Sequence, residues 1–216
     1  MDAEFERRYF AELAAAYVRG SMATAPGASA AAALIAQGLQ AGLRLHRFKR
    51  TAELPRVRKV LGVLRGLAPT DLLDVGSGRG VFLWPLLDAF PDLHVWAIDR
   101  LPHRIAGIDA VHRGGVSRLN AAVMDVARLG FGAQSVDGVT MLEVLEHLPD
   151  PAQAAREAVR VARRFVVVSV PSREDDNPEH IHLFTRAALE RLLLTAGARR
   201  VSFDGVLNHL IAVALV

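Results

Sequence analysis

Two short stretches of the sequence carry side chains that could take up a proton or hold a cation. Glu143, Glu146 and His147 stand close together, and His180 and His182 follow further along the chain. Histidine has an unperturbed pKa of about 6.5, so an imidazole can act as a general base for an oxygen acceptor near neutral pH. Two carboxylates and two imidazoles could instead hold a divalent cation that polarises a hydroxyl group.

A glycine-rich turn is the second candidate site. Residues 72–75 form a short apolar run typical of a buried parallel strand, and Gly76, Gly78 and Gly80 follow at alternate positions. A strand that turns into a helix through glycines brings backbone N–H groups close to a ligand, which indicates a nucleotide-like cofactor. The dinucleotide fingerprint G-x-G-x-x-G does not fit, because its third glycine would fall at Val81.

The elements that must position these residues alternate between strands and helices. Strands are predicted at residues 72–75, 94–98, 119–124, 136–144 and 165–170, with helical patterns between them. Two further strands, at 201–203 and 209–216, are close enough in the chain to pair as an antiparallel hairpin. This alternation predicts an α/β fold with a doubly wound sheet, and ligands bind such a sheet at the carboxyl ends of its strands.

Acidic residues stand at several of these strand ends. Asp99 ends the second strand about twenty residues beyond the glycine turn, where a carboxylate can accept two hydrogen bonds from a ribose diol. A simpler interpretation is that Asp99 caps the next helix. Asp125 ends the third strand and could equally be a turn residue. We therefore expect Asp99, Asp125 and the Glu143–His147 stretch to share one edge of the sheet.

Three sequence segments, taken together in chain order, resemble motifs of the class I S-adenosylmethionine-dependent methyltransferases of the ubiquinone-biosynthesis and general "methyltransferase domain" type. They are residues 74–80, 141–151 and 178–185, and the resemblance covers about residues 55–216. It implies a Rossmann-like seven-stranded sheet with an antiparallel C-terminal strand. It also implies transfer of a methyl group to O, N or C of an acceptor by in-line displacement at the sulfonium of S-adenosylmethionine.

The resemblance also implies which residues hold the cofactor. Asp125 is similar to the acidic residue with which this family holds the adenine amino group. The expected cofactor-binding set is Asp74, Gly76, Ser77, Gly78, Gly80, Asp99, Arg100, Asp125, Val126 and Glu143.

Motifs and residue types that the sequence lacks restrict the range of possible methyl acceptors. No Asn/Asp-Pro-Pro-aromatic motif follows the fourth strand, which disfavours the exocyclic amines of DNA bases and the amide of Gln as acceptors. The chain has no cysteine, which excludes covalent C5 methylation of pyrimidines, disulfides and thiolate zinc sites. An oxygen acceptor is therefore favoured.

The cluster of acidic residues and histidines has three interpretations. It could only shape the substrate site, His147 could be a general base, or the cluster could hold a metal. The Glu-x-x-Glu-His spacing with a later His is similar to the metal-dependent small-RNA 2′-O-methyltransferases, but we favour a site without metal. The expected catalytic residues are His147, Glu143, Glu146 and His182.

An N-terminal helical segment, residues 1–54, precedes the expected methyltransferase domain at 55–216. Phe5, Tyr9, Leu13 and Tyr17 fall on one helical face, which predicts an amphipathic helix, and we expect the segment to cover the acceptor pocket. The uncharged residues 20–43 are too weakly hydrophobic for a stable membrane span. Acidic residues directly after the first Met are unlike a signal peptide, so a cytoplasmic protein is expected.

A basic block at residues 44–59 leaves undecided which class of partner the protein binds. It is either the solvated side of a helix, whose other side Val57, Val60, Leu61 and Leu64 would bury, or a patch for an anionic substrate such as RNA. The function predicted first is S-adenosylmethionine-dependent O-methylation of a small molecule. The alternatives are an RNA ribose 2′-O-methyltransferase with a metal-assisted Glu/His site and a non-catalytic S-adenosylmethionine-binding protein.

Overall fold

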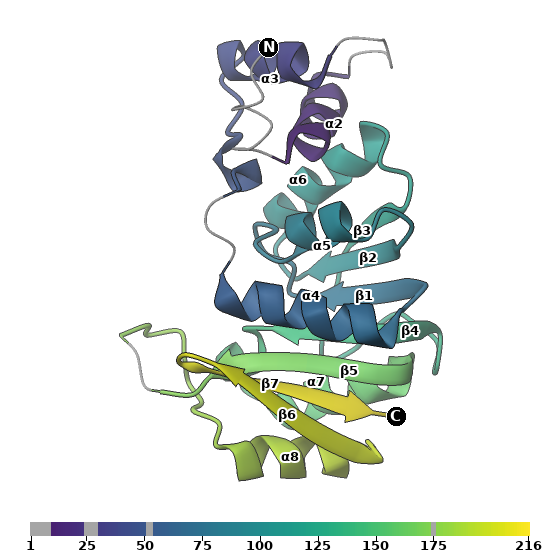
Figure 1. Ribbon diagram of the computed structural model, residues 1–216, viewed down its shortest axis with the longest axis vertical. Coiled ribbons are helices and arrows are strands. Elements are labelled where there is room, and N and C mark those ends of the chain that lie inside the picture. Colours follow the sequence, from purple (N-terminus) through teal and green to yellow (C-terminus); the bar gives the residue numbers. More distant parts are fainter. Residues whose placement is uncertain (1–9, 24–29, 51–53, 174–175) are drawn as a thin grey trace.

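A seven-stranded sheet forms the centre of the computed structural model, which describes residues 10–23, 30–50, 54–173 and 176–216. Its strands are β1 (Asp71–Val75), β2 (His94–Asp99), β3 (Leu119–Val123), β4 (Val136–Leu142), β5 (Ala162–Pro171), β6 (Arg200–Val206) and β7 (His209–Leu215). They are ordered β3-β2-β1-β4-β5-β7-β6 across the sheet (Figure 1). Strands β1 to β5 run parallel, while β7 pairs antiparallel with both β5 and β6. The predicted Rossmann-like sheet and its closing hairpin are therefore confirmed.

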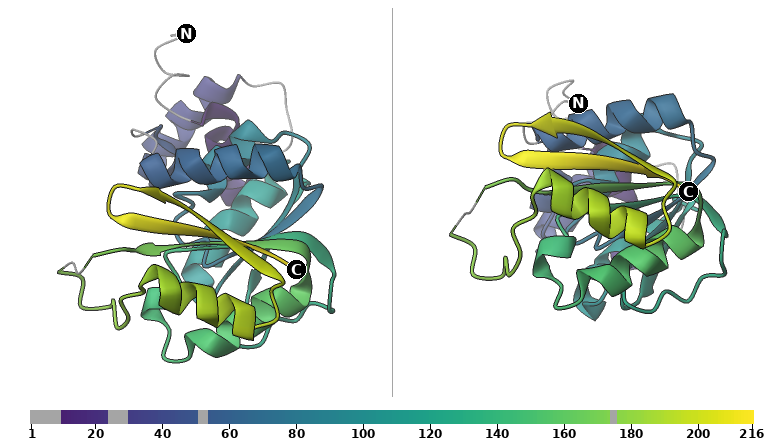
Figure 2. Two further views of the ribbon diagram at one scale, coloured as in Figure 1. Left: turned by 60° about the horizontal axis from the view of Figure 1, so that its bottom comes forward. Right: turned by 90° about the horizontal axis from the view of Figure 1, so that it is seen from below.

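Helices cover both faces of the sheet because successive strand residues point to opposite sides. Leu72 is buried in one hydrophobic core and Leu73, its neighbour, in the other. The first core is covered by α4 (Pro55–Leu67), α5 (Leu83–Ala89) and α6 (Pro102–Arg113), and the second by α7 (Pro151–Val161) and α8 (Arg186–Thr195). Figure 2 shows α4 and α8 on opposite faces.

Local capping sets where α7 and α8 begin. Asp150 accepts a hydrogen bond from the backbone N–H of Gln153 at 2.9 Å, and Thr185 accepts one from Ala188 at 3.2 Å. Both side chains stand at N-cap positions. Gly197, with a φ of 111°, follows the end of α8. These caps fix the ends of the loops that lead from β4 and β5 into the helices.

Two N-terminal helices, α2 (Ala11–Met22) and α3 (Ala31–Gln40), precede a 3-10 turn, η1 (His46–Phe48). Figure 1 shows α2 beside α6, toward the β3 edge of the sheet, and α3 packed on α2. Helices α2 and α6 approach closely through glycines, since a Cβ on Gly20 would lie 1.9 Å from the carbonyl oxygen of Ala110. Arg19 Nε donates a hydrogen bond to the Gly114 carbonyl at 2.8 Å. Apolar residues of α2, α3 and α6 belong to one continuous core.

The first predicted helix lies partly outside the described residues, because Phe5 and Tyr9 precede residue 10. The predicted apolar side of α4 is confirmed, since Val57, Val60, Leu61 and Leu64 are all buried. Within the described residues no helix is long and apolar enough to cross a membrane. Whether residues 1–54 cover an acceptor pocket stays a prediction.

Candidate functional site

A cleft of about 280 Å³ opens where the chain leaves the carboxyl ends of β1 and β4. This is the edge at which parallel strands of an open α/β sheet present ligand-binding residues. Its lining residues are Arg56, Val57, Asp74, Gly76, Ser77, Gly78, Arg79, Val81, Phe82, Arg104, Leu142 and Glu143. The predicted glycine turn and Glu143 thus share one cleft with two residues of α4.

The glycine turn has the backbone conformation that favours glycine. Gly76, Gly78 and Gly80 have φ values of 71°, 57° and 85°. A Cβ on Gly80 would lie 2.1 Å from the Trp84 ring, so no larger residue fits there without displacing the ring. The N–H groups of Gly76 and Ser77 donate to the Ile98 carbonyl at 2.8 and 3.0 Å. The turn therefore offers a ligand close approach to the backbone, while these two donors stabilise the turn itself.

Asp74 is a buried carboxylate at the floor of the cleft. Its Oδ1 accepts a hydrogen bond from Thr140 Oγ1 at 2.8 Å, while Oδ2 is buried without a hydrogen-bond partner among the described residues. Burial raises the pKa of Asp74 from 3.8 to about 6, and the nearby charge of Asp99 adds to the rise. The hydrogen bond from Thr140 opposes it, as does the nearby hydroxyl of Ser77, which donates to the Asp74 backbone carbonyl at 3.0 Å. A cationic ligand group would stabilise the ionised form of this carboxylate.

Asp99 is tied to the glycine turn by its side chain. Its Oδ2 accepts hydrogen bonds from the Gly78 N–H at 3.0 Å and from Arg104 at 3.2 Å. Its Oδ1 accepts one from the N–H of Leu101 at 2.9 Å, next to the start of α6. Asp99 therefore bonds both to the glycine turn and to the chain that enters α6, while its role toward a ribose stays a prediction.

Five residues of the expected cofactor set lie outside the cleft lining, namely Gly80, Asp99, Arg100, Asp125 and Val126. Asp125 is exposed, and its Oδ1 accepts a hydrogen bond from the Ala127 N–H at 2.9 Å, which is the geometry of a turn residue. Val126 is buried in the second core. Arg100 is exposed directly after β2. Their roles toward the cofactor stay predictions.

Glu143 is held in a strained backbone conformation at the end of β4. Its φ is 58°, a left-handed value that is uncommon for a residue with a side chain. Ser169 Oγ donates to Glu143 Oε1 at 2.5 Å, and His209 Nε2 lies 3.2 Å from Oε2. Arg56 Nε lies 3.9 Å from Oε1. Glu143 therefore belongs to a group with Ser169, His209 and Arg56, apart from the predicted histidines.

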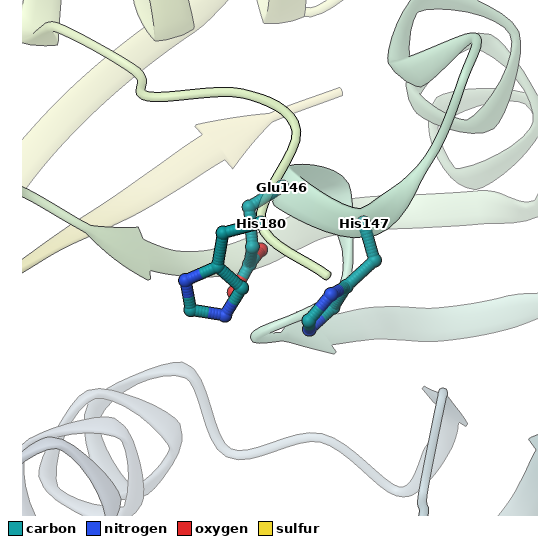
Figure 3. Close-up of side chains that lie close together, drawn as sticks. All are labelled: Glu146, His147 and His180. Atoms are coloured by element: carbon teal, nitrogen blue, oxygen red, sulfur yellow. The ribbon is translucent and has the colours of Figure 1, made fainter. Parts of the chain in front are cut away.

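Glu146, His147 and His180 form the compact part of the predicted cluster. One ligand-type atom from each lies within 4.8 Å of the others, and Glu146 is fully buried. Figure 3 shows Glu146 and His147 on the short turn after β4 and His180 on the facing loop. The His147 and His180 rings are 4.7 Å apart between centroids. Backbone N–H groups of Ile181 and His182 donate to the Glu146 carbonyl, which holds the loop against the turn.

His182 turns away from this compact group. Its Nε2 lies 2.9 Å from the carbonyl oxygen of Leu148, and its ring contacts Phe184 at 5.8 Å between centroids. The structure thus brings together only part of the predicted catalytic set, with Glu143 in one group, Glu146 and His147 in another, and His182 in neither.

Comparison with known proteins agrees with this geometry. Residues 73–167 match a protein-family model described as a methyltransferase domain. Over these residues the chain is similar to a methyltransferase domain. A comparison with curated protein sequences gave no match.

Solved structures of methyltransferases share the fold of this chain. An S-adenosylmethionine-dependent methyltransferase from Aquifex aeolicus aligns with a TM-score of 0.60 at 20% identity, over 74% of this chain and 96% of that one. Magnesium protoporphyrin IX methyltransferase from Synechocystis with bound S-adenosylhomocysteine aligns with a TM-score of 0.60 at 17% identity, over 74% and 81% of the two chains. An O-methyltransferase family protein from Burkholderia thailandensis aligns with a TM-score of 0.61 at 16% identity, over 74% of this chain but only 55% of its own length.

S-adenosylmethionine is the cofactor of this class of methyltransferase domain. The residues of the cleft fit it. The buried Asp74 Oδ2, which lacks a hydrogen-bond partner among the described residues, suits the ammonium group of the cofactor's amino-acid part. The glycine turn lets the ligand lie directly against the backbone, and Asp99 stands beside that turn.

The fold also places residues at the site that the sequence did not single out. Thr140 and Ser169 hold the two carboxylates, Arg104 bonds to Asp99, and His209 reaches Glu143 from β7. Thr140 and Ser169 lie within predicted strands. A polar residue inside an apolar run is the one sequence signal that could have indicated a role for them at the site. His209 gave no such signal, because it starts a strand that is distant in sequence.

Proposed function

We propose that the domain transfers the methyl group of S-adenosylmethionine to a hydroxyl oxygen of a small-molecule acceptor. The observation that carries the proposal is the hydrogen bond of His147. Its Nδ1 lies 2.9 Å from the carbonyl oxygen of Glu179. A carbonyl oxygen only accepts, so Nδ1 carries the ring proton in this bond and Nε2 is left as the basic nitrogen.

This arrangement suits removal of a hydroxyl proton. The cofactor supplies an electrophilic methyl group on a sulfonium. His147 Nε2 takes the proton of the acceptor hydroxyl as the new O–C bond forms and the S–C bond breaks. The buried carboxylate of Glu146, close to both imidazoles, stabilises the imidazolium that results. Proton removal by a positioned base contributes roughly 10²–10⁴-fold to a rate.

A small-molecule acceptor is favoured over RNA because part of the basic block is engaged within the protein. Arg50 forms a two-bond ion pair with Asp88 at 2.8 and 2.9 Å. Lys59 is 2.5 Å from an Asp204 oxygen. These contacts neutralise charge that an RNA backbone would require. The relatives from Burkholderia and Synechocystis, described as an O-methyltransferase family protein and a magnesium protoporphyrin IX methyltransferase, also support this choice.

The test replaces His147 with alanine and follows the transfer of a labelled methyl group to a panel of hydroxylated small molecules and to an RNA pool. We expect turnover to fall by about 10²–10⁴-fold, with S-adenosylhomocysteine affinity unchanged by calorimetry. His94→Ala, at the exposed start of β2, is the matched control and should leave turnover intact. Transfer only to RNA, lost as salt is raised, would favour the ribose methyltransferase alternative. Cofactor binding without transfer to any acceptor would favour the non-catalytic alternative.

A metal-assisted reaction is the second candidate, and the compact group favours it. Two imidazoles and one carboxylate, from His147, His180 and Glu146, are a common ligand set for divalent transition metals. In that case the cation, and not His147, would lower the pKa of the acceptor hydroxyl. Chelation separates the two mechanisms. EDTA should leave the rate unchanged if His147 is the base, while loss of activity with recovery on adding Mn²⁺ would establish the metal mechanism.

A further inference from the structure

We propose that a second pocket, at the edge of the sheet opposite to the cofactor cleft, binds a small ligand that carries a phosphate group. The pocket has a volume of about 380 Å³. Its lining residues are Leu67, Arg163, Arg164, Phe165, Arg199, Arg200, Leu215 and Val216. None of these residues lines the cofactor cleft, so the inference does not depend on the proposed methyl transfer.

The pairing of three strands brings the four arginines of this pocket together. Arg163 and Arg164 lie at the amino end of β5, which runs parallel to β4 and begins at the edge away from the cleft. Strand β7 runs antiparallel to β5 and β6, so Leu215 at its end pairs with both Phe165 and Arg200. The label C in Figure 1 marks this edge. The arginines therefore meet although two segments distant in the sequence supply them.

Two of the arginines are fixed in position by the protein. Arg163 Nη2 donates to Asp71 at 2.8 Å and to Asp137 at 3.1 Å, so two carboxylates balance its charge. Arg164 Nη2 donates to the Leu67 carbonyl at 2.6 Å, at the end of α4. An Asp137 oxygen lies 3.6 Å from its Nη1, beyond hydrogen-bond distance. Arg164 is thus held mainly by a neutral carbonyl group and keeps most of its charge for a ligand.

Arg199 and Arg200 carry charge that the protein does not neutralise. Both residues are exposed, and among the described residues neither guanidinium forms a hydrogen bond or an ion pair, the carboxylate of Val216 included. The backbone N–H of Arg199 donates to the Leu215 carbonyl at 2.8 Å, which fixes the point from which the two side chains start. Positive charges gathered around one pocket repel one another, and a bound anion relieves that repulsion.

The charge and the walls of the pocket select the class of ligand. A guanidinium fork matches the oxygens of a phosphate group, and a phosphate monoester carries about two negative charges near neutral pH where a carboxylate carries one. Leu67, Leu215 and Val216 add apolar surface between the arginines. The Arg164 guanidinium carbon lies 5.9 Å from the centre of the Phe165 ring. A phosphate group on a small apolar body therefore fits better than inorganic phosphate, and an enclosing pocket favours a small ligand over RNA.

Calorimetry with phenyl phosphate and inorganic phosphate, while S-adenosylhomocysteine saturates the cofactor cleft, tests the inference. The wild-type protein should bind phenyl phosphate more tightly than inorganic phosphate, because the phenyl ring buries apolar surface in the pocket. The double variant Arg199→Gln/Arg200→Gln should weaken phenyl phosphate by at least roughly tenfold, the usual effect of losing hydrogen bonds to a charged group.

The matched control is the double variant Arg58→Gln/Arg128→Gln, which removes the same charge from two exposed positions outside the pocket. It should leave the affinity for phenyl phosphate unchanged. Thermal melting checks that each variant is folded. The affinity for S-adenosylhomocysteine should be the same in all of these proteins, because the pocket and the cleft share no residue.

Three outcomes would overturn the inference. The wild-type protein could bind neither phosphate ligand, the folded Arg199→Gln/Arg200→Gln variant could bind phenyl phosphate as the wild type does, or the control variant could lose as much affinity. Binding of an RNA pool that needs Arg199 and Arg200, without binding of phenyl phosphate, would instead assign this edge to a nucleic acid. No readout here involves methyl transfer, so failure of the inference is distinct from failure of the proposed function.

Discussion

Asp74 shows at the scale of one residue how a functional site opposes stability. Its carboxylate is buried beside the cleft, with one oxygen bonded to Thr140 and the other without a hydrogen-bond partner in the described part of the chain. Burial raises its pKa from 3.8 to about 6. A carboxylate whose pKa is higher in the folded protein than in the unfolded chain destabilises the fold when it ionises. A cationic ligand group would offset that cost.

Asp74→Asn should therefore stabilise the protein at neutral pH and weaken cofactor binding. A pKa rise of roughly two units corresponds to about 3 kcal/mol. Below about pH 4 the carboxyl is protonated in both states and contributes nothing. Between about pH 4 and 6 the unfolded chain ionises first, so the stability of the wild type falls, and above about pH 6 the whole penalty is present.

Urea denaturation of both proteins at about pH 4.5 and about pH 8 measures this difference. The free energy of unfolding of Asp74→Asn should exceed that of the wild type by up to about 3 kcal/mol at the higher pH and by much less at the lower pH. Calorimetry should show weaker binding of S-adenosylhomocysteine. A stability difference that does not depend on pH would contradict the assignment of the raised pKa to Asp74.

The strand-turn-helix unit from β1 to α5 is the element that shapes the cofactor side of the cleft. The turn packs on Trp84, whose Nε1 donates to the Arg79 carbonyl at 3.0 Å and whose ring lies 4.8 Å from that of Phe48. The glycine spacing thus serves two purposes. It permits the left-handed backbone of the turn, and it leaves room for an aromatic side chain directly beneath it.

Gly80→Ala should disrupt this unit. The added methyl group would meet the Trp84 ring at 2.1 Å, and the φ of 85° is unfavourable for alanine. Overpacking and backbone strain together should lower the free energy of unfolding by at least about 2 kcal/mol, and S-adenosylhomocysteine affinity should fall. The matched control is Gly62→Ala in α4, where an added Cβ has open space. That change should stabilise the protein by about 0.5–1 kcal/mol. Equal effects of the two substitutions in urea denaturation would refute the packing argument.

At the scale of the whole molecule, the N-terminal helices complete the first core. Buried residues of α2 and α3 form one cluster with those of α5 and α6, so the segment is part of the folded domain. A truncation that removes it would expose apolar residues such as Ile105, Ile108 and Val111. Loss of activity in a truncated chain would then report unfolding, and a point substitution is a better test of the segment's role.

Gly114→Val should loosen the contact between α2 and α6. A Cβ at this position would lie 1.7 Å from the Ala16 carbonyl oxygen, and backbone cannot move aside as a flexible side chain can. We expect the free energy of unfolding to fall by about 1–3 kcal/mol, while S-adenosylhomocysteine affinity of the folded protein stays within about tenfold. Turnover measured well below the melting temperature decides whether the segment covers the acceptor. A loss of turnover supports that role, and unchanged turnover restricts residues 1–54 to a structural one.

The sequence by itself determined the fold and the class of cofactor. Alternating apolar runs and helical patterns specify which side of each strand is buried, as Leu72 and Leu73 show. Asp150 and Thr185 mark their helix starts by local hydrogen bonds. The spacing of Gly76, Gly78 and Gly80 restricts the turn to a particular backbone path. All of these signals lie within a few residues of one another, so they can be read before the chain is folded.

Only the tertiary structure decided how the chemical groups are combined. His209 and Arg56 reach Glu143 from β7 and α4. His182, predicted to join the histidine cluster, bonds instead to the Leu148 carbonyl. The sequence placed Glu143 and His147 near one edge of the sheet, because the carboxyl ends of parallel strands meet there, but it did not place His209 or Arg56 there. It could not pair them, because side-chain partners at that edge come from distant segments and depend on ångström-scale packing that no local spacing encodes.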